Sequence, residues 1–168
     1  GRTHRAVAAQ VRRPRPRFEA GAVHYFLGQP YRLQLFPGKR TRIKRVNEIL
    51  ELSSNLTEAA QLEGCLDRWY RDQAERIFAY RQQCLIARHQ ITAPTELKVR
   101  KMRAKWGSCS QSGLITLNLW LITQDIRAID YVILHELCHL SHFNHTPDFY
   151  AHLAALMPDW ERRRDLLI

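Results

Sequence analysis

The feature that most constrains this chain is the segment "IDYVILHELCHLSHFNH", residues 129–145, in which four histidines follow an apolar run. His135 and His139 lie four residues apart, and in a helix this spacing puts both imidazoles on one face. Two imidazoles one turn apart can reach the same metal ion at Zn–N distances of about 2.0–2.1 Å. Glu136 points about 100° away from His135, near such an ion without being forced to bind it. This His-Glu-x-x-His arrangement predicts a helical metal site with two ligands and a general base.

A third ligand is predicted after this helix. His142 shares the helical face, but its Cα lies about 10 Å along the axis from that of His135, so the three imidazoles converge poorly on one ion. His145 follows the expected end of the helix, where the chain can fold back, and we therefore favour His145 over His142. Cys138 also faces this side, and we interpret it as a packing residue rather than a ligand. A structural zinc site is disfavoured because paired cysteines are missing and Glu136 has no use there.

The residues before this segment predict strands and one long helix. The alternating stretch at 24–36, with the turn signal Gly28-Gln29-Pro30, predicts a strand meander that 42–52 continues. From about residue 57 to 90, apolar residues recur at helical spacing, and Pro94 ends this segment. Residues 97–121 predict two strands joined by the turn "SQSG".

Two further helices are predicted around the histidines. Thr123 is the expected N-cap of the helix that carries the metal motif. Thr146-Pro147-Asp148 predicts a second start, with a capping threonine, a proline at the first helical position and an acid at the positive end. The chain should therefore break between about 143 and 145, and the second helix should run to Met157, before Pro158. The order of elements predicts an α+β fold with a small β-sheet, a long helix and a metal-binding helix.

Charge divides the chain into two parts. Residues 1–17 contain six arginines and no acid, within a chain of formal net charge +10. Such a segment predicts a basic, disordered tail before a single domain at 18–168. A basic tail can bind nucleic acid weakly and without sequence preference, because phosphates attract it.

Length and composition exclude other classes. The 168 residues, 45% of them hydrophobic, suit one domain with a core. No apolar run reaches the roughly 18 residues of a membrane span, and the N-terminal residues lack the apolar segment of a secretory signal. The four cysteines show no paired spacing, so we expect reduced thiols and a cytoplasmic protein.

Two motifs resemble a known family. The Trp-Gly-Ser-Cys of residues 106–109 and the "YVILHELCHL…NH" run, within 97–160, resemble the YgjP-type metal-dependent hydrolases, which are zinc metallopeptidases related to the SprT-like and WLM proteases. The resemblance implies a zincin fold, zinc held by His135, His139 and His145, and Glu136 as the catalytic base. The spacing also equals that of metzincins, but His142 replaces the glycine that ends their helix and no Met-turn is evident.

We therefore expect a zinc-dependent peptidase acting on peptide or protein substrates, with Glu136 as general base toward a metal-activated water. An extended substrate should add to a sheet edge, for which the strand "GLITLN", residues 113–118, is the candidate. Three residues stay open as oxyanion donors: Asn118, Tyr150 and His152. One alternative is a metal-dependent hydrolase of nucleotide phosphoanhydrides, which the basic charge would suit. Others are a DNA-associated SprT-like protease and a nucleic-acid-binding module with a vestigial site, against which the intact Glu136 argues.

Overall fold

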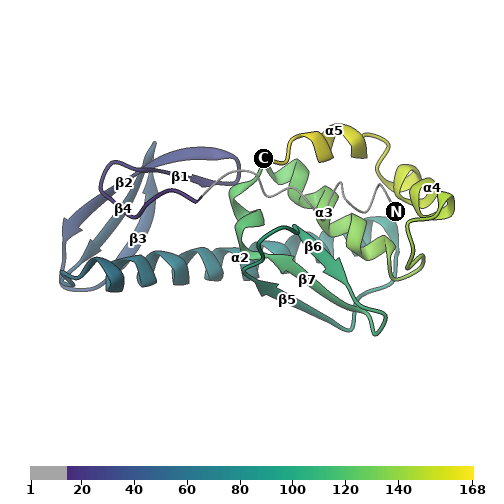
Figure 1. Ribbon diagram of the computed structural model, residues 1–168, viewed down its shortest axis with the longest axis horizontal. Coiled ribbons are helices and arrows are strands. Elements are labelled where there is room, and N and C mark those ends of the chain that lie inside the picture. The colour runs from purple at the N-terminus through teal and green to yellow at the C-terminus, as the bar shows by residue number, and fades with distance from the viewer. Residues whose placement is uncertain (1–14) are drawn as a thin grey trace.

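The computed structural model describes residues 15–168, and they form a mixed α+β fold (Figure 1). The expected class is confirmed, and the strands divide between two small sheets. The first sheet contains β1 (Val23–Phe26), β2 (Gln29–Pro37), β3 (Arg42–Val46) and β4 (Ile49–Ser54), and α2 (Ala59–His89) follows it. The second sheet and the remaining helices comprise β5 (Glu96–Arg100), β6 (Gly107–Cys109), β7 (Leu114–Asn118), the 3-10 helix η1 (Leu119–Thr123), α3 (Ile126–Cys138), α4 (Pro147–Leu156) and α5 (Trp160–Asp165).

The first sheet has the strand order β1-β2-β4-β3, so the predicted meander is wrong in its topology. Strand β4 lies between β2 and β3, parallel to the former and antiparallel to the latter. The side chains of β4 suit this position, because Leu50 and Leu52 are buried in the core. Strand β3 instead exposes Arg42, Lys44 and Arg45. Charged side chains of this kind suit an edge strand, since they discourage pairing with another chain.

The long helix predicted from about residue 57 to 90 is confirmed as α2, which has 31 residues and extends from the first sheet to the second (Figure 1). Its first half meets the first sheet, where Tyr70 Oη donates to the carbonyl of Tyr25 at 2.7 Å. Farther along, Arg71 donates to the carbonyl of Val99 in β5 at 2.9 Å. The helix therefore fixes the two sheets relative to each other.

The second sheet has the order β5-β7-β6, which places β7 in the centre. The predicted turn at 110–113 is confirmed, and Gly113 provides its positive φ of 88°. The prediction that 113–118 forms the sheet edge is wrong. Both faces of β7 are covered, with Leu117 and Asn118 each 0% exposed, and a strand buried in this way belongs in the middle of a sheet. The short strand β6, which packs against α3, is the edge near the histidines.

The helix that carries the metal motif begins later than predicted. Thr123 ends the 3-10 helix η1, and its hydroxyl donates to the carbonyl of Trp120 at 2.6 Å, so it does not cap α3. Asp125 is the cap instead, and it accepts from the backbone N–H of Arg127 at 2.8 Å. Residues 128–138 are all buried, so α3 is a core helix rather than a surface helix.

The second predicted start is confirmed at α4. Thr146 is its N-cap and accepts from the Phe149 N–H at 3.4 Å, and Pro147 occupies the first turn. The helix ends at Leu156, one residue before the predicted end. Sequence analysis missed α5, which follows Pro158.

Most of the predicted tail, residues 1–14, lies outside the described residues, so its disorder stays a prediction. Of its last three residues, Arg15 forms an ion pair with Asp67 of α2 and stacks on the Trp120 ring at 4.0 Å. All four cysteines are free thiols, as expected. Within residues 15–168, no helix combines the length and the apolar character needed to cross a membrane.

Candidate metal centre

Three histidines, from α3 and from the loop that follows it, converge at the end of α3. The candidate ligand nitrogens of His135, His139 and His145 all lie within 4.8 Å of one another. The Nε2 atoms of His135 and His145 are 3.2 Å apart. Two nitrogens bound tetrahedrally at about 2.0–2.1 Å from one ion would be separated by about 3.3 Å. The donor set therefore fits a metal ion that prefers imidazole ligands.

The end of α3 brings His145 back to the other two histidines. His139 is the C-cap of α3, and the chain turns there through hydrogen bonds such as His142 N–H to the carbonyl of Cys138, at 2.9 Å. The loop then returns His145 just before the capped start of α4. The helix ends earlier than the predicted break near 143–145, so the returning loop is longer than expected.

Hydrogen bonds orient the two helical imidazoles. The Nδ1 atom of His139 is 3.1 Å from the carbonyl of His142, and a carbonyl can only accept, so Nδ1 carries the proton. The Nε2 atom of neutral His139 is then the one with a lone pair for a metal. The Nδ1 atom of His135 lies 3.4 Å from the hydroxyl of Tyr131, which leaves its Nε2 facing His145.

Phe149 of α4 packs against all three imidazoles. Its ring stacks on that of His139 at 4.4 Å between centroids and lies 5.0 Å from those of His135 and His145. Phe149 is 0% exposed, so it forms a rigid apolar wall. Sequence analysis did not identify this residue. The available signal was its position in the first turn of the helix that Thr146 caps, directly after His145.

His142 is not part of the cluster, and its ring instead lies 5.2 Å from that of His152. Its contribution is the backbone carbonyl that accepts from His139. Cys138 is 0% exposed and packs in the core, and burial raises the pKa of its thiol to about 12.

Glu136 lies beside the histidines as a buried carboxylate, 3% exposed. Its Oε1 is 3.9 Å from His135 Nε2, and its Oε2 has no hydrogen-bond partner within residues 15–168. Burial raises the pKa of Glu136 to about 8, and the charge of Lys105 acts in the opposite direction. A buried carboxylate without a partner is unfavourable unless a cation lies close to it. The environment of Glu136 therefore also fits a bound metal ion.

Gly107 lets β6 approach α3 at this point. A Cβ atom on Gly107 would lie 3.1 Å from Glu136 Cγ, 3.2 Å from Val132 Cγ1 and 3.3 Å from Leu117 Cδ2. These separations are tighter than ordinary van der Waals contacts. The glycine of the Trp-Gly-Ser-Cys motif is thus required for the close packing that positions Glu136.

A cleft of about 300 Å³ opens beside the histidines. Lys105, Ser108 and Cys109 line it from the β6 side, and loop residues 143–145 line it from the end of α3. Burial and the nearby Glu136 raise the pKa of Cys109 to about 11, so its thiol is protonated at neutral pH. Cys109 is therefore not activated as a nucleophile.

The three residues left open as oxyanion donors lie in different settings. Asn118 is buried, and its amide donates to the carbonyls of Lys105 at 2.8 Å and Met102 at 3.0 Å. Both amide hydrogens are therefore used, so Asn118, one of the three candidates, is not available as an oxyanion donor. The Tyr150 ring is 6.1 Å from that of His145, whereas His152 lies against His142.

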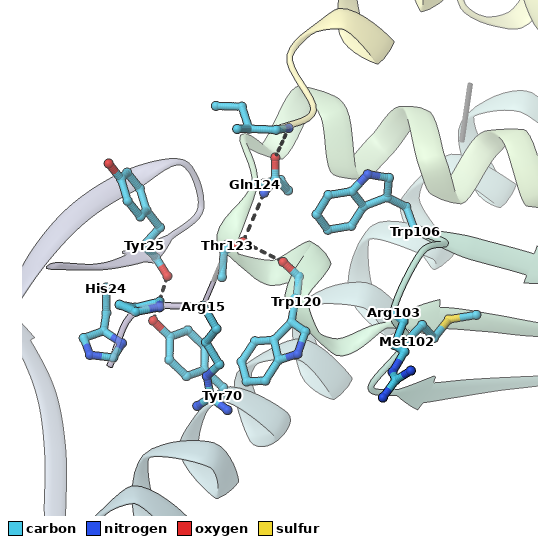
Figure 2. Close-up of a pocket in the computed structure, with 12 residues that line it drawn as sticks. Arg15, His24, Tyr25, Tyr70, Met102, Arg103, Trp106, Trp120, Thr123 and Gln124 are labelled. Carbon is cyan, nitrogen blue, oxygen red and sulfur yellow. Dashed lines mark hydrogen bonds between the residues drawn. The ribbon is translucent and has the colours of Figure 1, made fainter. Parts of the chain in front are cut away.

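A second cavity, of about 270 Å³, is lined by Trp106, the residue before Gly107 (Figure 2). Trp106 is 1% exposed and lines this cavity together with Trp120, Tyr70 and Tyr25. A hydrogen-bond chain joins Gln124, Thr123 and the carbonyl of Trp120 along one side. Trp106 is therefore a core aromatic. Its burial fixes the start of β6, and none of the three clustered histidines lines this cavity.

One family model covers nearly the whole chain and agrees with the chemistry of the cluster. A family model described as the YgjP-like metallopeptidase domain matches residues 2–168. Among solved structures, the metallopeptidase zymogen of Methanocaldococcus jannaschii jannalysin is 21% identical, with 51% of this chain and 82% of that chain covered and a TM-score of 0.45. The zymogen of Pyrococcus abyssi abylysin is also 21% identical, with 55% and 87% covered and a TM-score of 0.43. The search of curated proteins found no match.

Proposed function

Because the chain belongs to the YgjP-like metallopeptidase family, we propose that it hydrolyses peptide bonds with zinc bound by His135, His139 and His145. In this proposal Glu136 is the general base. The observation that carries it is the convergence of three imidazoles beside one buried carboxylate. Three neutral nitrogen ligands are a common catalytic zinc set, and they leave one position for water or substrate.

Zinc bound at these residues would polarise the scissile carbonyl and lower the pKa of a water molecule. The chain's own contribution begins with orientation. The carbonyl of His142 and the hydroxyl of Tyr131 fix the ring nitrogens of His139 and His135, and Phe149 restricts all three rings. A ligand set that is held in place does not need to reorganise on binding, which raises its affinity.

Glu136 then holds and moves the proton. Its carboxylate accepts a proton from the attacking water and can return it to the leaving amine. Oε2 makes no hydrogen bond within the described part of the chain, so it has a lone pair to accept with. Gly107 lies close against this side chain and restricts its position.

The substitution Glu136→Gln tests this role. We expect the zinc content to be unchanged and peptide hydrolysis to fall by at least about 100-fold, the scale of a lost general base. Glu75→Gln, on the exposed face of α2, is the matched control and should keep full activity. Zinc is measured by elemental analysis, and cleavage is measured with a library of quenched peptides.

Nucleotides assayed in parallel separate the two enzyme classes. Release of phosphate or pyrophosphate without cleavage of any peptide would support the phosphoanhydride hydrolase in place of the peptidase. Full peptidase activity in Glu136→Gln would instead remove Glu136 as the base while leaving the peptidase assignment intact.

A further inference from the structure

We propose that Lys105 forms a subsite for a substrate carboxylate at one end of the cleft, so that the enzyme prefers peptides with a negative charge there. This inference rests on the proposed peptidase function. It starts from the position of Lys105, which lines the cleft together with Glu136, His139 and His145.

The charges in the cleft favour an anion. Apart from the clustered histidines, Lys105 is its one basic residue, and Glu136 is its one acid. Glu136 is 3% exposed, so it presents little negative charge to a ligand outside the metal cluster. An anionic group that enters the cleft therefore meets the exposed cation Lys105, and none of the described residues that line the cleft is an exposed carboxylate.

The ammonium group of Lys105 is available to a ligand. Within residues 15–168 it has no ion-pair partner, in contrast to Lys101, whose ammonium is 3.1 Å from Asp67 and lies over the Trp120 ring. The two lysines lie on the same turn between β5 and β6. Lys101 therefore has a structural role, whereas the ammonium of Lys105 makes no ion pair among the described residues and acts on Glu136 only through its charge.

The backbone at Lys105 is held in place. The buried amide of Asn118 donates to the carbonyl of Lys105 at 2.8 Å, and the Asn118 N–H donates to the carbonyl of Trp106 at 2.9 Å. The next residue, Trp106, is 1% exposed. Only the side chain of Lys105 has to be ordered on binding, which limits the entropy cost of using it as a subsite.

The positive charge lies at one end only. A neighbouring groove of about 330 Å³ shares His139 and Phe143 with the cleft and continues toward the turn between β6 and β7. Its other lining residues, at 92–93, 95, 110–113 and 140–141, are uncharged. A peptide lying along β6 would therefore meet a cation on one side of the metal cluster and a neutral surface on the other. Lys105 should select for charge on one side of the scissile bond.

A carboxylate can come from an Asp or Glu side chain or from the end of the peptide, and the experiment separates these sources. The full chain loaded with zinc is assayed on quenched peptide pairs that differ by Glu or Gln at each position around the cleaved bond. A second set compares free and amidated C-termini. We expect kcat/KM to be about fivefold higher for the acidic member at one position, the scale of a favourable ion pair.

Variants assign the preference to Lys105. Lys105→Gln should abolish it, and Lys105→Glu should reverse it in favour of peptides with Lys at that position. Lys98→Glu is the matched control, since Lys98 is exposed on β5, away from the cleft, and should keep the wild-type preference. A ratio between paired peptides is used because it is insensitive to a general loss of activity.

Equal cleavage of Glu and Gln peptides by the wild type would overturn the proposal, as would an acidic preference that persists in Lys105→Glu. If no peptide is cleaved, the proposed function fails, and the subsite is tested by binding instead. Fluorescent Glu and Gln peptides are titrated onto zinc-loaded Glu136→Gln with and without Lys105→Glu. Tighter binding of the Glu peptide that depends on Lys105 supports the subsite, and equal binding refutes it.

Discussion

At the residue scale, the metal centre depends on neighbours that do not bind the metal. Phe149 contacts each imidazole, the carbonyl of His142 fixes His139, and Gly107 leaves room for Glu136. The His142 contribution comes from its backbone rather than its ring. Substitutions of His142 and His145, which are only three residues apart, should therefore have different effects on metal binding.

We expect His145→Ala to weaken zinc binding by more than about 100-fold, since losing a ligand should exceed the 10- to 100-fold effect of losing a supporting contact. His142→Ala should change it by less than about threefold, because the carbonyl that accepts from His139 is retained. Competition with a chromophoric chelator measures both affinities. Equal losses in the two variants would show that His142 also binds the metal.

Gly107→Ala should lower both stability and activity. The added Cβ would press on Glu136, Val132 and Leu117, and overpacking of this kind costs about 1–3 kcal/mol. Urea unfolding measures the stability, and kcat/KM measures the displacement of Glu136. Gly64→Ala is the control, because Cβ there would meet only Arg68 Nη1 at 3.6 Å and alanine favours the helix by about 0.5–1 kcal/mol. An unperturbed Gly107→Ala variant would mean that β6 can move away without cost.

At the element scale, α2 holds α3 through a paired charge. Arg81 donates two hydrogen bonds to Asp130, at 2.8 and 2.6 Å. The Asp130 side chain is 11% exposed, so the pair is largely shielded from water. The pair therefore helps to fix the rotation of α3 against α2.

A double-mutant cycle over Arg81→Met and Asp130→Asn should give a coupling energy of about 1–3 kcal/mol in urea unfolding. The exposed pair Arg71–Glu75 in the same helix, 3.9 Å apart, is the control and should give less than about 0.5 kcal/mol. A coupling for Arg81–Asp130 as small as the control would show that apolar packing alone orients α3.

At the scale of the whole molecule, the positive charge is spread over several surfaces. The formal net charge is +10, and residues 1–14 contribute four arginines without an acid. Arg15 is different, since it pairs with Asp67 and stacks on Trp120. A deletion that tests the tail should therefore stop before Arg15, so that this contact with α2 and η1 is preserved.

We expect the full chain to bind single- or double-stranded nucleic acid weakly and without sequence preference. Deleting residues 1–14 should weaken this binding and reduce the log–log salt slope by up to about 3.6 on double-stranded DNA, because up to four phosphates lose their partners. Zinc content should not change, since the metal cluster is built from residues 135–149. Fluorescence anisotropy over a salt series measures the slope. Unchanged affinity would show that nucleic acid binds to the described residues instead, for example to the basic edge strand β3.

Local signals were readable from the sequence alone. The apolar stripe of α2, the Thr146-Pro147 start of α4 and the spacing of His135 and His139 depend on helical periodicity and capping, which act within a few residues. The same kind of reasoning indicated that His145 lies past the end of the helix. Thr123 was mistaken for the cap of α3 because Asp125 offers an equivalent local signal two residues later.

Only the tertiary structure decided which distant residues meet. The insertion of β4 between β2 and β3, the central position of β7 and the contacts of Gly107, Asn118 and Phe149 all join different elements of the fold. Strand order depends on which arrangement buries the most apolar surface and pairs the most backbone groups at once, and no short stretch of sequence contains that sum. The sequence by itself determined that two histidines and a glutamate share one helix, whereas the fold decided what surrounds them.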